Sequence, residues 1–244
     1  MSTDTRPTFL LDGTPVPFTP GQTLMQAAQA AGHYIPHLCH HADFAPIGSC
    51  KVCSVRLIGP AGGAMGGRTT AACTMPAQAG LVVESETTAL QHDRQRLVQM
   101  LFAEGNHHCP FCEKSGQCHL QAVGYHLGMQ DTHFVHAYPV HEVDASHPDV
   151  WLDRSRCILC ELCVRASREV DGKNVFAVGG RGAQTTLLVN SPSGHLHDSA
   201  IAATDRAVSI CPVGALLPKR QGFRIPIGER PYDHVDIADH PQDT

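Results

Sequence analysis

The residues of this chain best suited to chemistry are its cysteines, of which there are eleven in 244 residues. Thiolates are ligands for soft transition metals, and four donors complete a typical site. The cysteines form an upstream group, a middle group beside two histidines, and a downstream group. In order, these groups are Cys39, Cys50, Cys53 and Cys73; Cys109, Cys112 and Cys118; and Cys157, Cys160, Cys163 and Cys211. If one histidine completes the middle group, three four-ligand sites leave no thiol over.

Metal binding explains these cysteines better than disulfides do. Their number is odd, and residues 1–20 lack the basic start and apolar core of a secretory signal. Disulfides belong mainly to secreted proteins. The longest apolar run is far shorter than the roughly 18 residues of a membrane span. A net charge of −5 without a basic stripe excludes a nucleic-acid-binding class. We therefore expect a cytoplasmic metal protein with no membrane span and no nucleic-acid partner.

The elements around the upstream group predict an α+β domain. Residues 8–18 are expected to form a β-hairpin, because Asp12-Gly13 separates two short apolar runs. A helix is expected next, with Thr23 as its N-cap and Gly32 as its stop. A long loop then carries three of the cysteines. Further strands are expected at 52–58, before Cys73 and at 81–85, with the Gly-rich run 59–67 as a hairpin tip.

This order of hairpin, helix, cysteine loop and strands is that of a small β-grasp ferredoxin. The upstream spacing is Cys-x10-Cys-x2-Cys-x19-Cys, whereas plant-type 2Fe–2S ferredoxins use Cys-x4-Cys-x2-Cys and a distant fourth cysteine. The close pair and the distant cysteine therefore match, and the first gap is longer. A structural zinc site is the alternative, although such sites usually have two close pairs.

The middle group follows an amphipathic helix expected over 87–104, whose apolar face is Leu90, Leu97, Met100 and Leu101. His107 and His108 both stand beside Cys109. Neighbouring residues rarely both reach one metal, and His107, two residues before the cysteine, is favoured as the fourth ligand. Imidazole in place of a thiolate removes a negative charge and makes a cluster easier to reduce.

The downstream group has the Cys-x2-Cys-x2-Cys run of bacterial ferredoxins, in which Cys-Pro follows after three residues. Ser167 stands at that fourth position here. Cys211, followed by Pro212, is therefore the candidate for the fourth ligand. Ser167 as an oxygen ligand is the alternative to a solvated or capping serine. Residues 128–150 are expected to be a connector, 174–190 a short sheet, and 224–244 a tail that lies on a partner or in solvent.

Nothing in the sequence predicts a substrate site. No G-x-G-x-x-G follows a strand, no G-x-x-x-x-G-K-[ST] occurs, and no catalytic triad or carboxylate pair can be argued from spacing. We therefore expect no catalytic residue and no NAD- or FMN-binding residue in this chain. Three ligand sets without a substrate site indicate electron transfer, and dinucleotide and flavin chemistry would belong to another subunit. The alternative from a different class is a scaffold stabilised by zinc.

Beyond the upstream cysteine set, the most distinctive parts of the sequence are the runs CPFCEKSGQCHLQ, RCILCELCVRASREVDG, GGRG and SICPVGAL. With these residues, and over nearly its whole length, the chain resembles the small iron–sulfur diaphorase subunit of soluble NAD-reducing [NiFe] hydrogenases. That subunit is similar to the N-terminal part of the large iron–sulfur subunit of NADH:quinone oxidoreductase. The quinone-oxidoreductase relatives have their ligand histidine four residues before the first middle cysteine, where this chain has Gly105.

The resemblance implies one 2Fe–2S cluster and two 4Fe–4S clusters. It implies electron transfer between small and large [NiFe] hydrogenase subunits and a diaphorase subunit that binds FMN and NAD. The respective ligand sets would be Cys39, Cys50, Cys53 and Cys73; His107, Cys109, Cys112 and Cys118; and Cys157, Cys160, Cys163 and Cys211.

The corresponding domains are a 2Fe–2S ferredoxin-like domain at 1–86, a histidine-plus-three-cysteine domain at 87–135, a four-cysteine domain at 136–223 and the tail at 224–244. The chain stops soon after Cys211, which favours the separate diaphorase subunit over longer relatives. The equivalent subunit of an NAD-dependent formate dehydrogenase or an NADH dehydrogenase is the alternative.

Overall fold

The computed structural model describes residues 5–60 and 67–240, and it divides the chain into two compact units. The first comprises Met1–Val98, His126–Gly128 and Ile237–Thr244, and the second comprises Gln99–Tyr125 and Met129–Asp236. Residues 61–66 of the predicted hairpin tip lie outside the described residues, as do the ends of the predicted first domain and tail.

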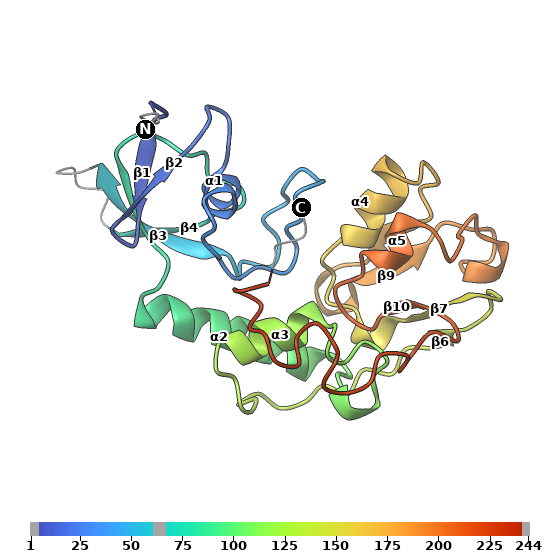
Figure 1. The fold of residues 1–244 in the computed structure, drawn as a ribbon. Coiled ribbons are helices and arrows are strands. Elements are labelled where there is room, and N and C mark those ends of the chain that lie inside the picture. Colours follow the sequence, from blue (N-terminus) through green and yellow to red (C-terminus); the bar gives the residue numbers. More distant parts are fainter. Residues whose placement is uncertain (1–4, 61–66, 241–244) are drawn as a thin grey trace. The chain divides into compact units, whose positions relative to one another are not determined.

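A five-stranded mixed sheet forms the first unit (Figure 1). Its strand order is β2-β1-β5-β3-β4, in which β1 pairs in parallel with β5 and the other pairs are antiparallel. The strands are β1 (Thr8–Leu11), β2 (Thr14–Pro17), β3 (Ser54–Pro60), β4 (Arg68–Ala71) and β5 (Leu81–Glu84). Asp12 and Gly13 have φ of 49° and 83°, as the tight turn of the predicted hairpin requires.

Helix α1 (Leu24–Ala30) closes this core. Thr23 caps it as predicted, since its hydroxyl accepts from the Gln26 N–H and the Gln26 side chain accepts from the Thr23 N–H. The buried face of α1 joins the inner sheet residues in one apolar cluster that includes Leu24, Met25, Ala27, Ala28, Phe9, Val16, Val55, Leu57 and Val83. The predicted β-grasp domain of the α+β class is confirmed.

Helix α2 (Thr88–Glu104) begins one residue after the predicted start and ends at the predicted residue, but its predicted apolar face is partly wrong. Leu90 is buried, whereas Met100 is 38% exposed and Leu97 is half-buried. The inward positions instead include Arg94 and Val98, which are 1% and 0% exposed. A buried arginine breaks the apolar pattern, so periodicity alone selects the wrong residues.

The second unit contains two small sheets and short helices (Figure 1). One sheet has the order β10-β7-β6, and the other is the antiparallel pair β8 and β9 predicted within 174–190. The predicted connector 128–150 contains β6, a short strand that the sequence does not indicate. The elements are α3 (His119–His126), β6 (Val143–Asp144), β7 (Val150–Asp153), α4 (Leu162–Glu169), β8 (Phe176–Gly179), β9 (Thr186–Val189), α5 (Arg206–Ser209) and β10 (Leu216–Pro218).

Candidate metal centres

The upstream cysteines gather at the end of the sheet in the first unit. Three precede β3 in the loop from α1, and Cys73 follows β4. The Cys50 N–H donates to Cys39 Sγ over 3.5 Å. Lys51 has a φ of 60°, which turns the backbone between Cys50 and Cys53. The chain therefore brings cysteines from two distant segments into one buried group.

The pKa values of Cys50 and Cys53 are those of thiols that become thiolates only when they bind a metal. A hydrogen bond with Cys39, together with burial, raises the pKa of the Cys50 thiol well above its usual range. A hydrogen bond with Cys73, then burial, raises the pKa of Cys53, and accepting that bond lowers the pKa of Cys73. Neighbouring buried sulfurs cannot all be thiolates unless positive charge joins them. The donor set therefore fits an iron–sulfur cluster, whose irons supply that charge.

Arg94 holds the backbone on each side of Cys53. Its Nε donates to the Val52 carbonyl over 3.1 Å, and Nη2 donates to the Ser54 carbonyl over 2.9 Å. It also donates to the Ser85 carbonyl and hydroxyl, each over 2.9 Å. Sequence reasoning missed this residue. The available signal was a single arginine four residues from Leu90 and four from Val98, on the side of the helix that must face the sheet.

The middle cysteines and His107 line one cavity in the second unit. Cys109 begins a 3₁₀ turn, η1 (Cys109–Phe111), and Cys118 immediately precedes α3. The pKa of Cys118 is raised to about 12, and that of Cys109 is also raised, chiefly because these thiols are buried. The full lining of the cavity is Phe102, His107, Cys109, Cys112, Ser115, Cys118, Leu120, Gln121, Arg156 and Gly214.

The imidazole of His107 is suited to be the fourth donor of this set. Within the described chain, its Nε2 is buried and has no hydrogen-bond partner. Burial and the nearby charge of Arg156 lower the pKa of His107 to about 4, so the ring is neutral near pH 7 and keeps a lone pair for a metal. His108 is exposed and does not line the cavity.

Gly105 explains how the ring of His107 fits. A Cβ built at Gly105 would lie 2.5 Å from His107 Nε2 and 3.1 Å from the Ser155 carbonyl oxygen. The ring therefore occupies the space that a side chain at position 105 would need. A chain with a side chain at position 105 could not place His107 in this way.

The downstream cysteines line a second, mostly apolar cavity. Leu159 and Glu161 have φ of 52° and 59°, and these left-handed turns curl the loop so that its three cysteines face inward. Burial raises the pKa of Cys157 to about 11 and that of Cys163 well above its usual range. The lining consists of Cys157, Ile158, Leu159, Cys160, Glu161, Cys163, Val178, Leu187, Cys211, Pro212, Val213, Ala215 and Leu216.

Ser167 has a different task from the cysteines. It is 1% exposed, it does not line the downstream cavity, and its hydroxyl accepts from the Val175 N–H over 2.8 Å. The hydroxyl thus joins α4 to the segment that leads into β8. This contact supports a structural role and gives no support to Ser167 as an oxygen ligand.

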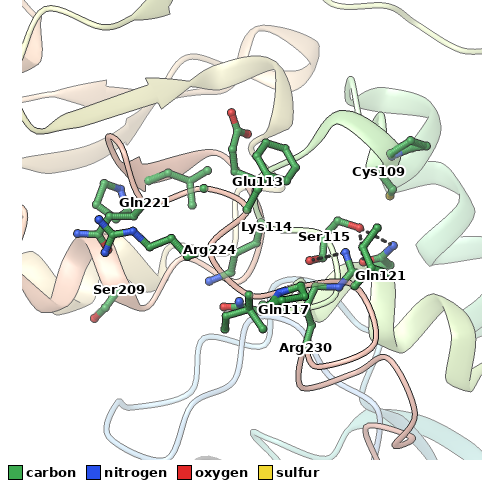
Figure 2. Close-up of a pocket in the computed structure, with 18 of the residues that line it drawn as sticks. Cys109, Glu113, Lys114, Ser115, Gln117, Gln121, Ser209, Gln221, Arg224 and Arg230 are labelled. Atoms are coloured by element: carbon green, nitrogen blue, oxygen red, sulfur yellow. Dashed lines mark hydrogen bonds between the residues drawn. The ribbon is translucent and has the colours of Figure 1, made fainter.

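A larger cavity of about 780 Å³ lies beside the middle group and is lined partly by the tail (Figure 2). Arg230 lies against the backbone of Gly116, donates to the Ser115 carbonyl over 3.2 Å and pairs with Asp233 at 2.6 Å. The Tyr232 N–H donates to the Gly116 carbonyl over 3.0 Å. The tail is therefore anchored on the loop between two of the middle cysteines.

No helix within residues 5–60 and 67–240 combines the length and the apolar character that crossing a bilayer would need. Among the His, Cys, Asp and Glu side chains that the structure describes, no three are positioned to hold a single metal ion. The middle and downstream sets are accordingly grouped by the cavities that they share, and the upstream set by its thiol contacts.

Three family profiles match consecutive parts of the chain. Residues 4–88 match a 2Fe–2S iron–sulfur cluster binding domain, and residues 94–133 match the NADH-ubiquinone oxidoreductase-G iron–sulfur binding region. Residues 150–217 match a 4Fe–4S single cluster domain. The chain therefore contains one 2Fe–2S domain followed by 4Fe–4S domains, as the sequence predicts.

Similar proteins cover almost the whole chain. The gamma chain of the NAD-reducing hydrogenase HoxS from Cupriavidus necator is 40% identical over 224 residues, which are 91% of this chain and 92% of that protein. The mitochondrial NADH-ubiquinone oxidoreductase 78 kDa subunit of Candida albicans is 30% identical over 94% of this chain, but the match spans only 31% of that protein.

A solved structure agrees with these relatives. A chain in the crystal structure of an NAD+-reducing [NiFe]-hydrogenase in the H2-reduced state is 53% identical and superposes with a TM-score of 0.88. The match covers 95% of this chain and 94% of that one. The cluster domains, the shared length and the fold together lead to one conclusion: the chain belongs to the gamma-chain family of NAD-reducing hydrogenases.

Proposed function

We propose that this chain is the electron-transfer subunit of an NAD-reducing hydrogenase complex. Three iron–sulfur clusters would each accept and release one electron at a time between a [NiFe] hydrogenase module and a subunit that binds FMN and NAD. The observation that carries this proposal is the presence of three ligand sets, two of them lining cavities and one in a buried thiol group. The chain's own residues bind and bury these sites, and we assign them no catalytic role.

The proposed ligands are those expected from the sequence, one set for each cluster. His107 is the proposed imidazole ligand, supported by its buried, unpartnered Nε2 and by its place in the cavity lining. Cys211 is the proposed fourth ligand of the downstream set, supported by the cavity that it shares with Cys157, Cys160 and Cys163.

We also propose the partners, the domains and the compartment expected from the sequence. The partners are the diaphorase subunit and the small and large [NiFe] hydrogenase subunits, and the complex is cytoplasmic. The domains are 1–86, 87–135, 136–223 and the tail 224–244. The tail's approach to a partner is supported by Ile225 and Ile227, which are 40% and 85% exposed beside the cavity of Figure 2. Exposed apolar side chains that together form one patch are typical of interaction surfaces.

Metal analysis tests the function directly. Anaerobically purified complex is expected to contain about ten irons and ten sulfides in this chain, as one 2Fe–2S and two 4Fe–4S clusters require. Electron paramagnetic resonance (EPR) after reduction with hydrogen or NADH should then show all three centres reduced. Finding about three zinc ions and no sulfide would instead establish a structural scaffold. Centres that stay oxidised with both reductants would contradict electron transfer.

Separate alanine variants test the imidazole ligand. His107→Ala should change the EPR spectrum of the middle cluster, because the fourth iron loses its donor. His108→Ala is the matched control and should leave that spectrum unchanged, since this side chain is exposed. An altered spectrum in the His108 variant and a normal one in the His107 variant would reverse the assignment.

A further inference from the structure

Arg156 lies where the middle and downstream sites approach each other. It immediately precedes Cys157, and its guanidinium lines the middle cavity. Nη1 lies 3.7 Å from Cys112 Sγ, with a geometry that makes it a hydrogen-bond donor to that sulfur. The same nitrogen lies 3.4 Å from the carbonyl oxygen of Gly214, three residues beyond Cys211. One side chain therefore contacts a proposed ligand of the middle site and the backbone leading from a proposed ligand of the downstream site.

The guanidinium is fixed from several directions. Nε lies 2.9 Å from Asp153 Oδ2, and Nη1 lies 3.1 Å from Glu113 Oε2. The ring of Trp151 stacks on it, with Cζ 5.1 Å from the ring centroid. Only 20% of the side chain is exposed. A planar, multiply bonded cation of this kind keeps its position, unlike a lysine ammonium on a flexible chain.

The local backbone places the Arg156 side chain in the lining of the middle cavity. Residues Arg154–Arg156 form a 3₁₀ turn, η2, directly after β7. Asp153 caps this turn by accepting from the Ser155 N–H over 2.9 Å, and its other carboxylate oxygen binds Arg156. The neighbouring Arg154 donates instead to the Leu187 carbonyl, over 2.9 Å. The turn therefore directs Arg154 and Arg156, which are separated by Ser155, to different partners.

The two sites are also joined directly through the backbone. The His119 N–H donates to the Pro212 carbonyl over 2.8 Å, and these residues follow Cys118 and Cys211 respectively. Gly214 passes so close to the middle site that a Cβ there would lie 2.6 Å from Cys112 Sγ. Hydrogen-bonded polypeptide therefore joins the two sets, and the difference between the potentials of their clusters sets the driving force for electron transfer between them.

We propose that Arg156 is a positioning residue that raises the reduction potential of the middle cluster through its N–H···S bond and positive charge, and that Glu113 opposes it. The physical reason is that reduction adds one negative charge, which a fixed cation and a donor to a ligand sulfur stabilise. Glu113, 31% exposed and paired with Arg156, contributes charge of the opposite sign. The step tuned is a one-electron transfer in which no bond is made or broken. The inference rests on the proposed function, because it needs a cluster in the middle site.

Two substitutions with opposite expected signs test this role. Arg156→Gln and Glu113→Gln are prepared in the full chain within its complex, and the middle cluster is titrated electrochemically with EPR detection. Arg156→Gln should lower the ratio of reduced to oxidised middle cluster at a fixed potential about tenfold, equivalent to about −59 mV for one electron. Glu113→Gln should raise that ratio, and the downstream cluster should shift less in either variant. Arg168→Gln removes the same charge from an exposed position on α4 and should shift neither cluster.

Cluster content separates failure of this inference from failure of the proposed function. If wild-type protein contains no iron and sulfide, the proposed function itself fails. If all variants contain their clusters and the middle potential does not move, or moves in the same direction in both, then only the role of Arg156 is overturned. If Arg156→Gln does not assemble its middle cluster, Arg156→Lys and Glu113→Gln complete the test. The role is supported if the reduction potential of the middle cluster falls in Arg156→Lys by less than the shift expected for Arg156→Gln and rises in Glu113→Gln. Any other pair of results overturns the role.

Discussion

Replacing Arg94 with methionine is expected to destabilise the first unit by about 3–5 kcal/mol and to release its 2Fe–2S cluster more readily. The buried guanidinium donates to the carbonyls of Val52, Ser54 and Ser85. Methionine fills a similar volume but offers no donor, so these acceptors remain buried and unsatisfied. Two of the carbonyls flank Cys53, and the loss is therefore transmitted directly to a proposed ligand.

Hydrogen exchange in β3 and β5 measures this effect in the first unit alone, which a global unfolding curve of a two-unit protein would not do. The rate of loss of the 2Fe–2S EPR signal on warming gives a second measurement. Arg96→Met is the matched control, because Arg96 is an exposed arginine on the same helix. Arg94→Lys should restore part of the stability. Equal exchange in the Arg94 and Arg96 variants would show that the buried hydrogen bonds contribute nothing.

Gly214→Ala should cost the protein most of its middle cluster. The added methyl group would lie 2.6 Å from Cys112 Sγ and 3.4 Å from Lys114 Cβ. Either Cys112 Sγ must turn from its present place in the cavity lining or the backbone after Cys211 must shift. Overpacking of this kind costs about 1–3 kcal/mol, which here acts on a ligand rather than on ordinary core packing.

EPR of the middle cluster, with iron and sulfide analysis, measures the outcome. Gly179→Ala is the control in the same unit, since its new methyl group would meet the end of the Leu188 side chain, which is 44% exposed and free to turn aside. The control should retain all its clusters. If the Gly214→Ala variant had a full middle cluster with a normal EPR spectrum, the segments that carry Cys112 and Gly214 would be able to move apart without cost.

Much of the fold was predictable because the signals are local. Asp12-Gly13 specifies its own turn, Thr23 and Gln26 cap α1, and the alternating segments near 176 and 189 form a two-stranded sheet. The inward face of α2 was not predictable, because Arg94 is buried where it donates hydrogen bonds to carbonyls that are distant in the sequence. Strand β6 was also missed, since two residues carry no periodicity and the pairing partner lies further along the chain.

The candidate site divides in the same way. Cysteine spacing predicted three groups of ligands, and the middle and downstream groups each line one cavity in the structure. The family was predicted from sequence runs that resemble it, because these runs are local and need no knowledge of the fold. The environments of His107 and Ser167 could not be predicted from spacing. Only the structure shows that His107 Nε2 is buried without a hydrogen-bond partner and that the Ser167 hydroxyl accepts from the Val175 N–H. Arg156 gave no sequence signal, since its partners Glu113 and Gly214 are separated from it by more than forty residues.

The backbone hydrogen bond between His119 and Pro212 has a consequence for the assembly of the clusters in the cell. Each of these residues follows a proposed ligand of a different cluster, so ordering one loop restrains the other. Insertion of iron and sulfide at either centre would prepare the second, and maturation of this half of the protein would be cooperative. Under iron limitation, molecules would then carry both of these centres or neither of them, and molecules with only one of the two would be rare.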